Sequence, residues 1–400
     1  MTKLLRNCAT CVAIVGLSSA VFAREPQTSP PPQQQTIRAR MLGVPFEGTP
    51  GALNAITDVP GVTVGYATLI SGEGKLEIGK GPVRTGVTAI LPRGRGSFDD
   101  PVYAGVFSLN GNGEMTGTAW IEEGGFLEGP VMITNTHSVG TVRDAVIHWR
   151  VSQAGADPTG FFWSLPVVAE TYDGYLNDIN GFHVKPEHAA QALESAQAGP
   201  VAEGSVGGGT GMVAYEFKAG SGTASRVLEQ KAGGFTVGAF VQANCGRRPQ
   251  FMVAGVPVGK AIPDGAVFGK KDEGSIIIVI ATDAPLLPHQ LKRVARRASH
   301  GLARTGSTSG NGSGDLFVAF STANPGVATP EKPLHSVQTV PNDRLDPIFD
   351  ATVQAVEEAI VNSIIANQQD RTGQDGHKVI ALPHERLRAL LKEQKRPTGR

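Results

Sequence analysis

The most constraining feature of this chain is a long apolar run that starts with a serine placed directly after a glycine. Residues 272–291 read DEGSIIIVIATDAPLLPHQL, with five consecutive apolar residues from Ile276 to Ile280. An uninterrupted apolar run of this length predicts a buried strand, and the charged, turn-prone residues before Gly274 predict that it begins at Ser275. A buried strand has no evident need of a lone hydroxyl at its first position.

Two interpretations of Ser275 are open from this segment alone. In the first, Ser275 caps a strand after a turn, which is a common use of serine. In the second, the Ser275 hydroxyl attacks the carbonyl of Gly274, and hydrolysis of the resulting ester frees the α-amine of Ser275. Gly274 favours this rearrangement because it leaves the carbonyl uncrowded and tolerates strained torsions. An α-amine, whose ordinary pKa is about 7.7–8.0, can then serve as a base beside the hydroxyl.

The rest of the chain predicts layers of sheet and helix. Apolar and β-branched runs predict strands over 62–66, 85–91, 131–134, 236–243, 275–281 and 316–322. Helical apolar spacing predicts helices over 142–153, 186–198, 288–304, 347–367 and 384–393. Sheets and helices in one chain imply that helices cover the sheets. A formal net charge of zero gives no electrostatic attraction to nucleic acid or to an anionic membrane.

The N-terminus has the layout of a secretory signal over residues 1–23. Lys3 and Arg6 precede an apolar stretch that is too short to span a bilayer, and small residues end at Ala23. A retained anchor is the alternative. Residues 24–37 predict a flexible linker, residues 38–393 a single catalytic domain and residues 394–400 a solvated tail. We therefore expect an exported, periplasmic protein, free of the membrane once the signal is removed.

Common motifs of nucleotide, metal and hydrolase chemistry are missing from the sequence. It contains no GxxxxGK[ST], no GxSxG, no HExxH and no pair of CxxC motifs, and its nine histidines are scattered. Four other segments are unusual. They are the polar stretch 166–181, the glycine-rich stretch 203–226, the strand that ends at Asn244, and the Gly/Ser-rich loop before residues 316–322.

These segments together resemble one known family. The stretches MLGVPFEGTPGALNAITDVPGVTVGY, ETYDGYLNDIN, GPVAEGSVGGGTGM, VQANCG and GSIIIVIATDAPLLPHQLKRVARRA are similar to those of the self-processing D-aminopeptidase (L-aminopeptidase/D-esterase-amidase) and β-peptidyl aminopeptidase family. The resemblance covers about residues 38–393. It implies an α/β fold, a four-layer α-β-β-α sandwich like that of the N-terminal-nucleophile hydrolases but with different connectivity. It also implies a precursor cut into an α chain (24–274) and a β chain (275–400), assembled as (αβ)4.

The resemblance implies the nucleophile and its neighbours. Gly274–Ser275 matches the cleavage bond, and Ser275 the nucleophile. Ser313 and Asp315 match a hydroxyl–acid pair beside it, so the base is either Ser313 or the free α-amine. The β-peptidyl members carry glutamate where this chain has Asp315. Apart from the resemblance, Asp315 could simply cap its loop through backbone N–H groups.

Three further residues match the family's substrate contacts. Asn244 matches the oxyanion donor, Tyr172 is a candidate second donor, and Glu170 matches the carboxylate that holds the substrate's free α-ammonium. Asn244 as a turn residue and Glu170 as a structural ion-pair partner are the alternatives. Cys245 has no histidine near it in sequence and is expected to pack in the core. We expect Gly207–Gly211 to permit close backbone approach rather than to cradle an anion.

The expected function is that of an exported serine aminopeptidase without a cofactor or metal. It would release small N-terminal residues, such as glycine, D- or L-alanine and β-amino acids, from small peptides, amides or esters with a free N-terminal amine. The Gly-Ser cut, Tyr172 and Asp315 favour the L-aminopeptidase/D-amidase-esterase side of the family, whereas the opening GVPFEGTPGALNAITDV favours the β-peptidyl side. Two alternatives stay open: an acyltransferase of the ornithine acetyltransferase type, and a non-catalytic periplasmic binding protein.

Overall fold

The computed structural model describes residues 36–153, 163–269, 274–329 and 332–394. The predicted signal, residues 24–35 of the predicted linker and residues 395–400 of the predicted tail lie outside the described residues. The described residues belong to one compact unit. Among the helices of the described part, none combines the length and apolar character needed to cross a membrane.

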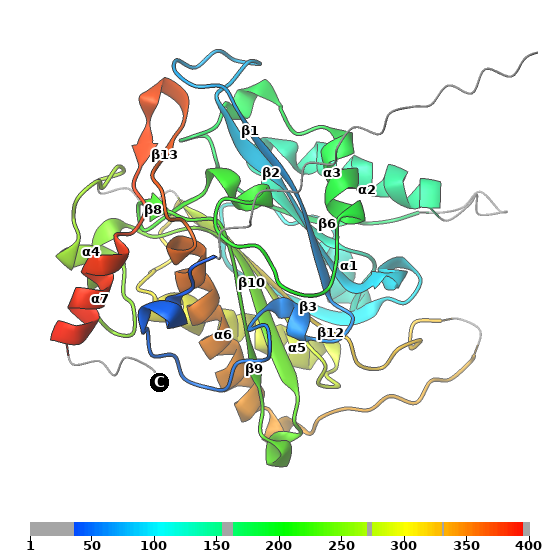
Figure 1. The fold of residues 1–400 in the computed structure, drawn as a ribbon. Helices are drawn as coiled ribbons and strands as arrows, with labels where there is room; N and C mark the ends of the chain where they lie inside the picture. The colour runs from blue at the N-terminus through cyan, green and yellow to red at the C-terminus, as the bar shows by residue number, and fades with distance from the viewer. Residues whose placement is uncertain (1–35, 154–162, 270–273, 330–331, 395–400) are drawn as a thin grey trace, which may run out of the picture. The chain divides into compact units, whose positions relative to one another are not determined.

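Two β-sheets form the centre of this unit (Figure 1). The first has six strands in the order β4-β3-β12-β11-β10-β9, with β11 and β12 parallel and the other neighbours antiparallel. Its strands are β3 (Val102–Gly111), β4 (Phe126–Leu127), β9 (Ser221–Val227), β10 (Thr236–Asn244), β11 (Ser275–Thr282) and β12 (Gly314–Ser321). The second has four strands in the order β1-β2-β5-β6. They are β1 (Thr63–Ser71), β2 (Val83–Arg95), β5 (Val131–Asn135) and β6 (Val167–Thr171).

The apolar run after Ser275 is continuous because β11 is covered on both faces. Ile276, Ile278 and Ile280 point into a core shared with helices α5 (Pro288–Arg304) and α6 (Asp346–Ile365). Ile277 and Val279 point into a second core, which lies between the two sheets. Every residue of β11 is buried, as the sequence predicts.

Helices also cover the outer face of the smaller sheet. Helices α2 (Val139–Gln153) and α3 (Pro186–Glu194) pack on it and form a third core with side chains of β1, β2, β5 and β6. The layers therefore run helix, sheet, sheet, helix, with α5 and α6 on the far side (Figure 1). This arrangement confirms the predicted α-β-β-α fold class.

Shorter elements complete the unit. They are α1 (Thr118–Gly124), α4 (Val258–Ala261), α7 (His384–Glu393), and two small hairpins, β7 (Val213–Ala214) with β8 (Phe217–Lys218) and β13 (Arg371–Thr372) with β14 (Lys378–Val379). The predicted helices over 288–304 and 384–393 have the observed bounds, whereas α3 ends at Glu194, four residues before the prediction.

Strands β3, β6 and β9 were not among the predicted strands, and packing explains two of these omissions. A Cβ added at Gly105 of β3 would lie 2.3 Å from the backbone nitrogen of Lys292 in α5. One added at Gly222 of β9 would lie 2.1 Å from the carbonyl oxygen of Ala359 in α6. Because the helices pack directly on these strands, the strands need glycine where a strand pattern needs a β-branched residue.

Candidate active site

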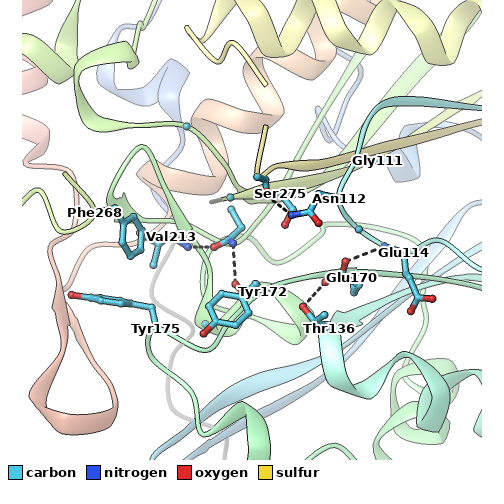
Figure 2. Close-up of a pocket in the computed structure, with 16 residues that line it drawn as sticks. Gly111, Asn112, Glu114, Thr136, Glu170, Tyr172, Tyr175, Val213, Phe268 and Ser275 are labelled. Carbon is cyan, nitrogen blue, oxygen red and sulfur yellow. Dashed lines mark hydrogen bonds between the residues drawn. The ribbon is translucent and has the colours of Figure 1, made fainter. Parts of the chain in front are cut away.

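The nucleophile predicted from the sequence lies at the end of the six-stranded sheet. Ser275 is the first residue of β11, and its partner across the antiparallel pair is Asn244, the last residue of β10. Directly opposite residues of such a pair project from the same face, with Cβ atoms about 4.5–5.5 Å apart. Both side chains line a cavity of about 850 Å³ (Figure 2). Strand pairing therefore places the hydroxyl of Ser275 beside the carboxamide of Asn244.

Strand β6 of the other sheet brings the remaining substrate contacts to the same cavity. Glu170 stands next to last in β6 and Tyr172 follows that strand, and both line the same cavity as Ser275 (Figure 2). Figure 2 also shows Tyr175 and Phe268 at one end of it. The cavity thus lies where the ends of the two sheets meet, with the predicted nucleophile on one sheet and the predicted ammonium-binding carboxylate on the other.

The peptide bond between Gly274 and Ser275 is packed closely between strands β10 and β12. A Cβ added at Gly274 would lie 2.2 Å from the carbonyl oxygen of Asn244, so glycine is required by the close approach of β10. On the other side, the Gly314 N–H donates to the Gly274 carbonyl oxygen at 3.3 Å. This contact polarises the carbonyl that the Ser275 hydroxyl would attack, as oxyanion donors do in acyl transfer.

The carboxamide of Asn244 is fixed in one orientation. Its Oδ1 accepts from the Val213 N–H at 2.8 Å, and its Nδ2 donates to the Tyr172 carbonyl oxygen at 2.9 Å. If the amide oxygen and nitrogen were exchanged, the nitrogen would face the Val213 N–H and the oxygen would face the Tyr172 carbonyl. Only the observed orientation therefore satisfies both contacts. Nδ2 keeps a second N–H, which is the group that an oxyanion donor needs.

Glu170 is a buried carboxylate, 3% exposed, with a partner for each oxygen. Oε1 accepts from the backbone N–H of Glu114 at 3.0 Å, and Oε2 accepts from the Thr136 hydroxyl at 2.5 Å. Burial raises the pKa of Glu170, and these two hydrogen bonds oppose that rise. A carboxylate has about four acceptor sites, so Glu170 can still accept a cationic donor such as an ammonium group.

Ser313 and Asp315 form a pair one strand away from Ser275. Ser313 Oγ donates to Asp315 Oδ1 at 2.6 Å, and both side chains are buried. Gly314, which lies between them, is the parallel-strand partner of Ser275. Neither side chain of the pair is among the residues that line the cavity. The structure therefore brings Ser275, Asn244, Glu170 and Tyr172 to one cavity, with the Ser313–Asp315 pair behind its wall.

Several lining residues were not anticipated from the sequence. Asn112 and Glu114 come from the loop after β3, where the letters NGNG indicate only a turn. Tyr175 and Phe268 pack edge to face, with ring centroids 4.9 Å apart, and they form an aromatic part of the wall. The density of polar residues over 166–181 was the one signal that could have marked Tyr175.

Two other expectations concern residues near the cavity. The residues Gly207–Gly211 are all buried, and a Cβ added at Gly209 would lie 2.3 Å from the backbone nitrogen of Ser221. Close approach is therefore what requires these glycines, as predicted. Cys245 packs in the core beneath α5 and α6, also as predicted. Within the described ranges, no group of three or more His, Cys, Asp or Glu residues is placed to hold a metal ion.

Comparison with known proteins identifies the family. The model of peptidase family S58 matches residues 54–379 of this chain. The chain belongs to peptidase family S58. A β-peptidyl aminopeptidase of Sphingosinicella microcystinivorans is 58% identical to it over 378 residues, which are 90% of this chain and 93% of that protein.

Solved structures of similar enzymes have the same fold. The L-aminopeptidase D-Ala-esterase/amidase of Ochrobactrum anthropi, described as a new variant among the Ntn hydrolase fold, superposes with a TM-score of 0.84. It is 51% identical, and the match covers 90% of this chain and 99% of that one. A β-aminopeptidase of Burkholderia sp. gives a TM-score of 0.80 at 50% identity, covering 89% and 99%. The chain is accordingly an aminopeptidase, and the family favours this activity over an acyltransferase or a binding protein.

Proposed function

We propose that this S58 aminopeptidase cuts itself between Gly274 and Ser275 and then uses Ser275 to release small N-terminal residues. The observation that carries the proposal is the position of Ser275. It is the first residue of a rigid, buried strand, it faces Asn244, and it opens into a cavity that Glu170 lines from the other sheet.

The self-cleavage would proceed in two steps. The Ser275 hydroxyl attacks the carbonyl carbon of Gly274, the C–N bond breaks, and the amine that leaves takes up the proton. The product is an ester between the Gly274 carbonyl and Ser275 Oγ. Water hydrolyses the ester, leaving a carboxylate on Gly274 and a free hydroxyl and α-amine on Ser275. The Gly314 N–H is placed to stabilise the oxyanion in both steps.

Peptide hydrolysis would reuse the same hydroxyl. Glu170 binds the substrate's α-ammonium, which fixes the first peptide carbonyl near Ser275. Ser275 Oγ attacks that carbonyl, the second N–H of Asn244 Nδ2 stabilises the oxyanion, and the leaving amine takes the proton. Water then hydrolyses the acyl-enzyme. Because the ammonium–Glu170 contact positions the substrate, substrates without a free N-terminal amine would be hydrolysed only slowly.

Two groups are suited to accept the Ser275 proton. One is the new α-amine of Ser275 itself. The other is the Ser313 hydroxyl, which can take up that proton as it passes its own proton to Asp315, the carboxylate to which it is hydrogen-bonded. A pH–rate profile of Ser313→Ala separates them. If the α-amine is the base, the variant keeps the wild-type titration near the pKa of an α-amine.

We further propose that β-amino acids are among the released residues. Support comes from the β-peptidyl aminopeptidase of Sphingosinicella microcystinivorans at 58% identity and from the Burkholderia β-aminopeptidase. The Ochrobactrum enzyme, at 51% identity, keeps D- and L-alanine as candidates. Hydrolysis of the p-nitroanilides of D-Ala, L-Ala and β-homo-alanine decides between them. No hydrolysis of any of the three would contradict the proposal.

The role of Ser275 has a direct test. Ser275→Ala should give one uncut band on a denaturing gel and no peptidase activity. Two bands with full activity would contradict the proposed mechanism.

Export and assembly are part of the same proposal. The layout of residues 1–23 supports export to the periplasm, with cleavage after about Ala23. The family resemblance supports an (αβ)4 assembly. Fractionation of cells that express the full chain tests the first, and light scattering of the purified enzyme tests the second.

A further inference from the structure

A buried lysine lies behind the predicted oxyanion donor. Lys218, in β8, has no exposed surface, and its Nζ donates to the carbonyl oxygens of Met212 at 2.8 Å and Ala219 at 2.5 Å. Within the ranges that the structure describes, no carboxylate lies within ion-pair distance of it. A buried amine without a carboxylate partner is costly, and burial lowers the pKa of Lys218 well below its usual value. A methionine would fill the same space without that cost.

The contacts of Lys218 continue to Asn244 through a single peptide group. The Met212 carbonyl that accepts from Lys218 belongs to the same peptide bond as the Val213 N–H. That N–H donates to Asn244 Oδ1 at 2.8 Å. The opposite end of the Asn244 carboxamide carries the N–H proposed to meet the oxyanion. Two amide groups therefore stand in series between the amine of Lys218 and the reacting carbonyl.

Amides in series polarise one another. A donor on a carbonyl oxygen increases the partial double-bond character of the C–N bond and makes the N–H of that amide a stronger donor. In this chain, Lys218 polarises the Met212–Val213 peptide, that peptide polarises the Asn244 carboxamide, and Asn244 Nδ2 becomes a stronger donor to an oxyanion.

The hairpin that carries this relay is anchored at both ends. Val213 of β7 pairs with Lys218 of β8, and the Ala219 N–H donates to the same Met212 carbonyl at 3.1 Å. The Tyr215 N–H donates to the carbonyl oxygen of Cys245, directly after Asn244, at 2.7 Å. The relay is therefore held against the end of β10 rather than on a mobile loop.

We propose that Lys218 is a positioning residue for the oxyanion site, which it orients and polarises through the Met212–Val213 peptide and Asn244. This inference rests on the proposed role of Asn244 in the function above. Lys218 is not among the residues that line the cavity.

The test is a double-mutant cycle on the processed enzyme, with rates expressed per free Ser275 amine. With an alanyl p-nitroanilide, Lys218→Met should lower kcat about three- to tenfold and leave KM nearly unchanged, because the polarisation acts on the transition state. Lys218→Gln keeps a neutral donor and should lower kcat less. This second variant also keeps the test available if Lys218→Met does not fold. In an Asn244→Ala background, either substitution should have no further effect.

A matched control separates the relay from a loosened hairpin. Phe217 is the buried neighbour of Lys218 on β8, and its ring packs against the Arg248 guanidinium. Phe217→Leu should lower the melting temperature without lowering kcat.

Three results would overturn the inference. The first is an unchanged kcat in Lys218→Gln or Lys218→Met. The second is a loss of kcat from Lys218→Gln that is equally large in the wild-type and the Asn244→Ala backgrounds. In both cases the proposed function would stand. Unchanged kcat in Asn244→Ala alone is the third, and it would remove the proposed oxyanion role as well.

Discussion

Replacing Glu170 with glutamine tests the proposed ammonium site with almost no change in shape. In the wild type, Oε1 accepts from the Glu114 N–H and Oε2 from the Thr136 hydroxyl. In Glu170→Gln, the amide oxygen can keep the first bond. The amide nitrogen can donate to Thr136, because a hydroxyl also accepts. The substitution therefore removes the charge while both neighbours keep a partner.

The size of the effect follows from the burial of this carboxylate. Two opposite unit charges 4 Å apart attract by about 4 kcal/mol at an effective dielectric constant near 20, and by about 1 kcal/mol in bulk water. Glu170 is 3% exposed but opens into a cavity. We therefore expect a loss of about 2–4 kcal/mol, which lowers kcat/KM by roughly 30- to 1,000-fold.

The assay compares two substrates that differ by one amine. Glu170→Gln should lower kcat/KM for alanyl p-nitroanilide by the stated factor and should leave the slow hydrolysis of the propionyl analogue near its wild-type rate. Glu114→Gln is the matched variant, because Glu114 is an exposed carboxylate on the same cavity. Its loss should be no more than about fivefold, as for screened charges. Equal losses on both substrates, or wild-type kcat/KM in Glu170→Gln, would refute the ammonium site.

The pH dependence provides an independent check. Because burial raises the pKa of Glu170, the wild type should lose kcat/KM on acidification at a higher pH than an ordinary glutamate would cause. Glu170→Gln has no carboxyl to protonate, so its acid limb should be missing.

Three further outcomes are expected. Gly274→Ala should slow self-cleavage, because the new Cβ would lie 2.2 Å from the Asn244 carbonyl oxygen and displace the bond to be cut. The two-chain fraction, followed with time on a gel, measures this, and an unchanged rate would contradict the proposed steric constraint. Burial raises the pKa of Asp173 to about 6, so the folded state binds this proton more tightly than the unfolded state. The resulting stability, present at low pH, is lost as the pH rises from about 4 to 6. The unfolding free energy of the wild type minus that of Asp173→Asn should therefore fall by up to about 3 kcal/mol over this pH range, and a difference that rises would contradict the raised pKa. Chelators should leave activity unchanged, and activity restored only by added metal would contradict the serine mechanism.

Sequence patterns predicted the layers better than the site. The run after Ser275 predicts a buried strand because β11 is apolar on both faces, and helical spacing gave the bounds of α5. Strands such as β3 and β9 lacked a signal because helices pack against their glycines. The approach of Glu170 to Ser275 depends on how two sheets stack, which no local pattern encodes, and only the family resemblance suggested it.

Other features of the site have no local signature at all. Lys218 sits in a short hairpin, where a lysine is normally solvent-exposed, and only the three-dimensional contacts show that it is buried behind Asn244. Glu114 and Phe268 lie on loops whose sequence predicts turns, yet both reach the cavity. The family resemblance identified Ser313 and Asp315 as site residues, and the structure shows that their side chains are hydrogen-bonded to each other.

The most direct test of the account is the covalent state of the active protein. Intact mass and N-terminal sequencing of purified, active enzyme should show two polypeptides, the second beginning with Ser275 and carrying a free α-amine. Full activity in a preparation whose chain is continuous from residue 274 to residue 275 would contradict the proposal that a freed Ser275 carries out the reaction.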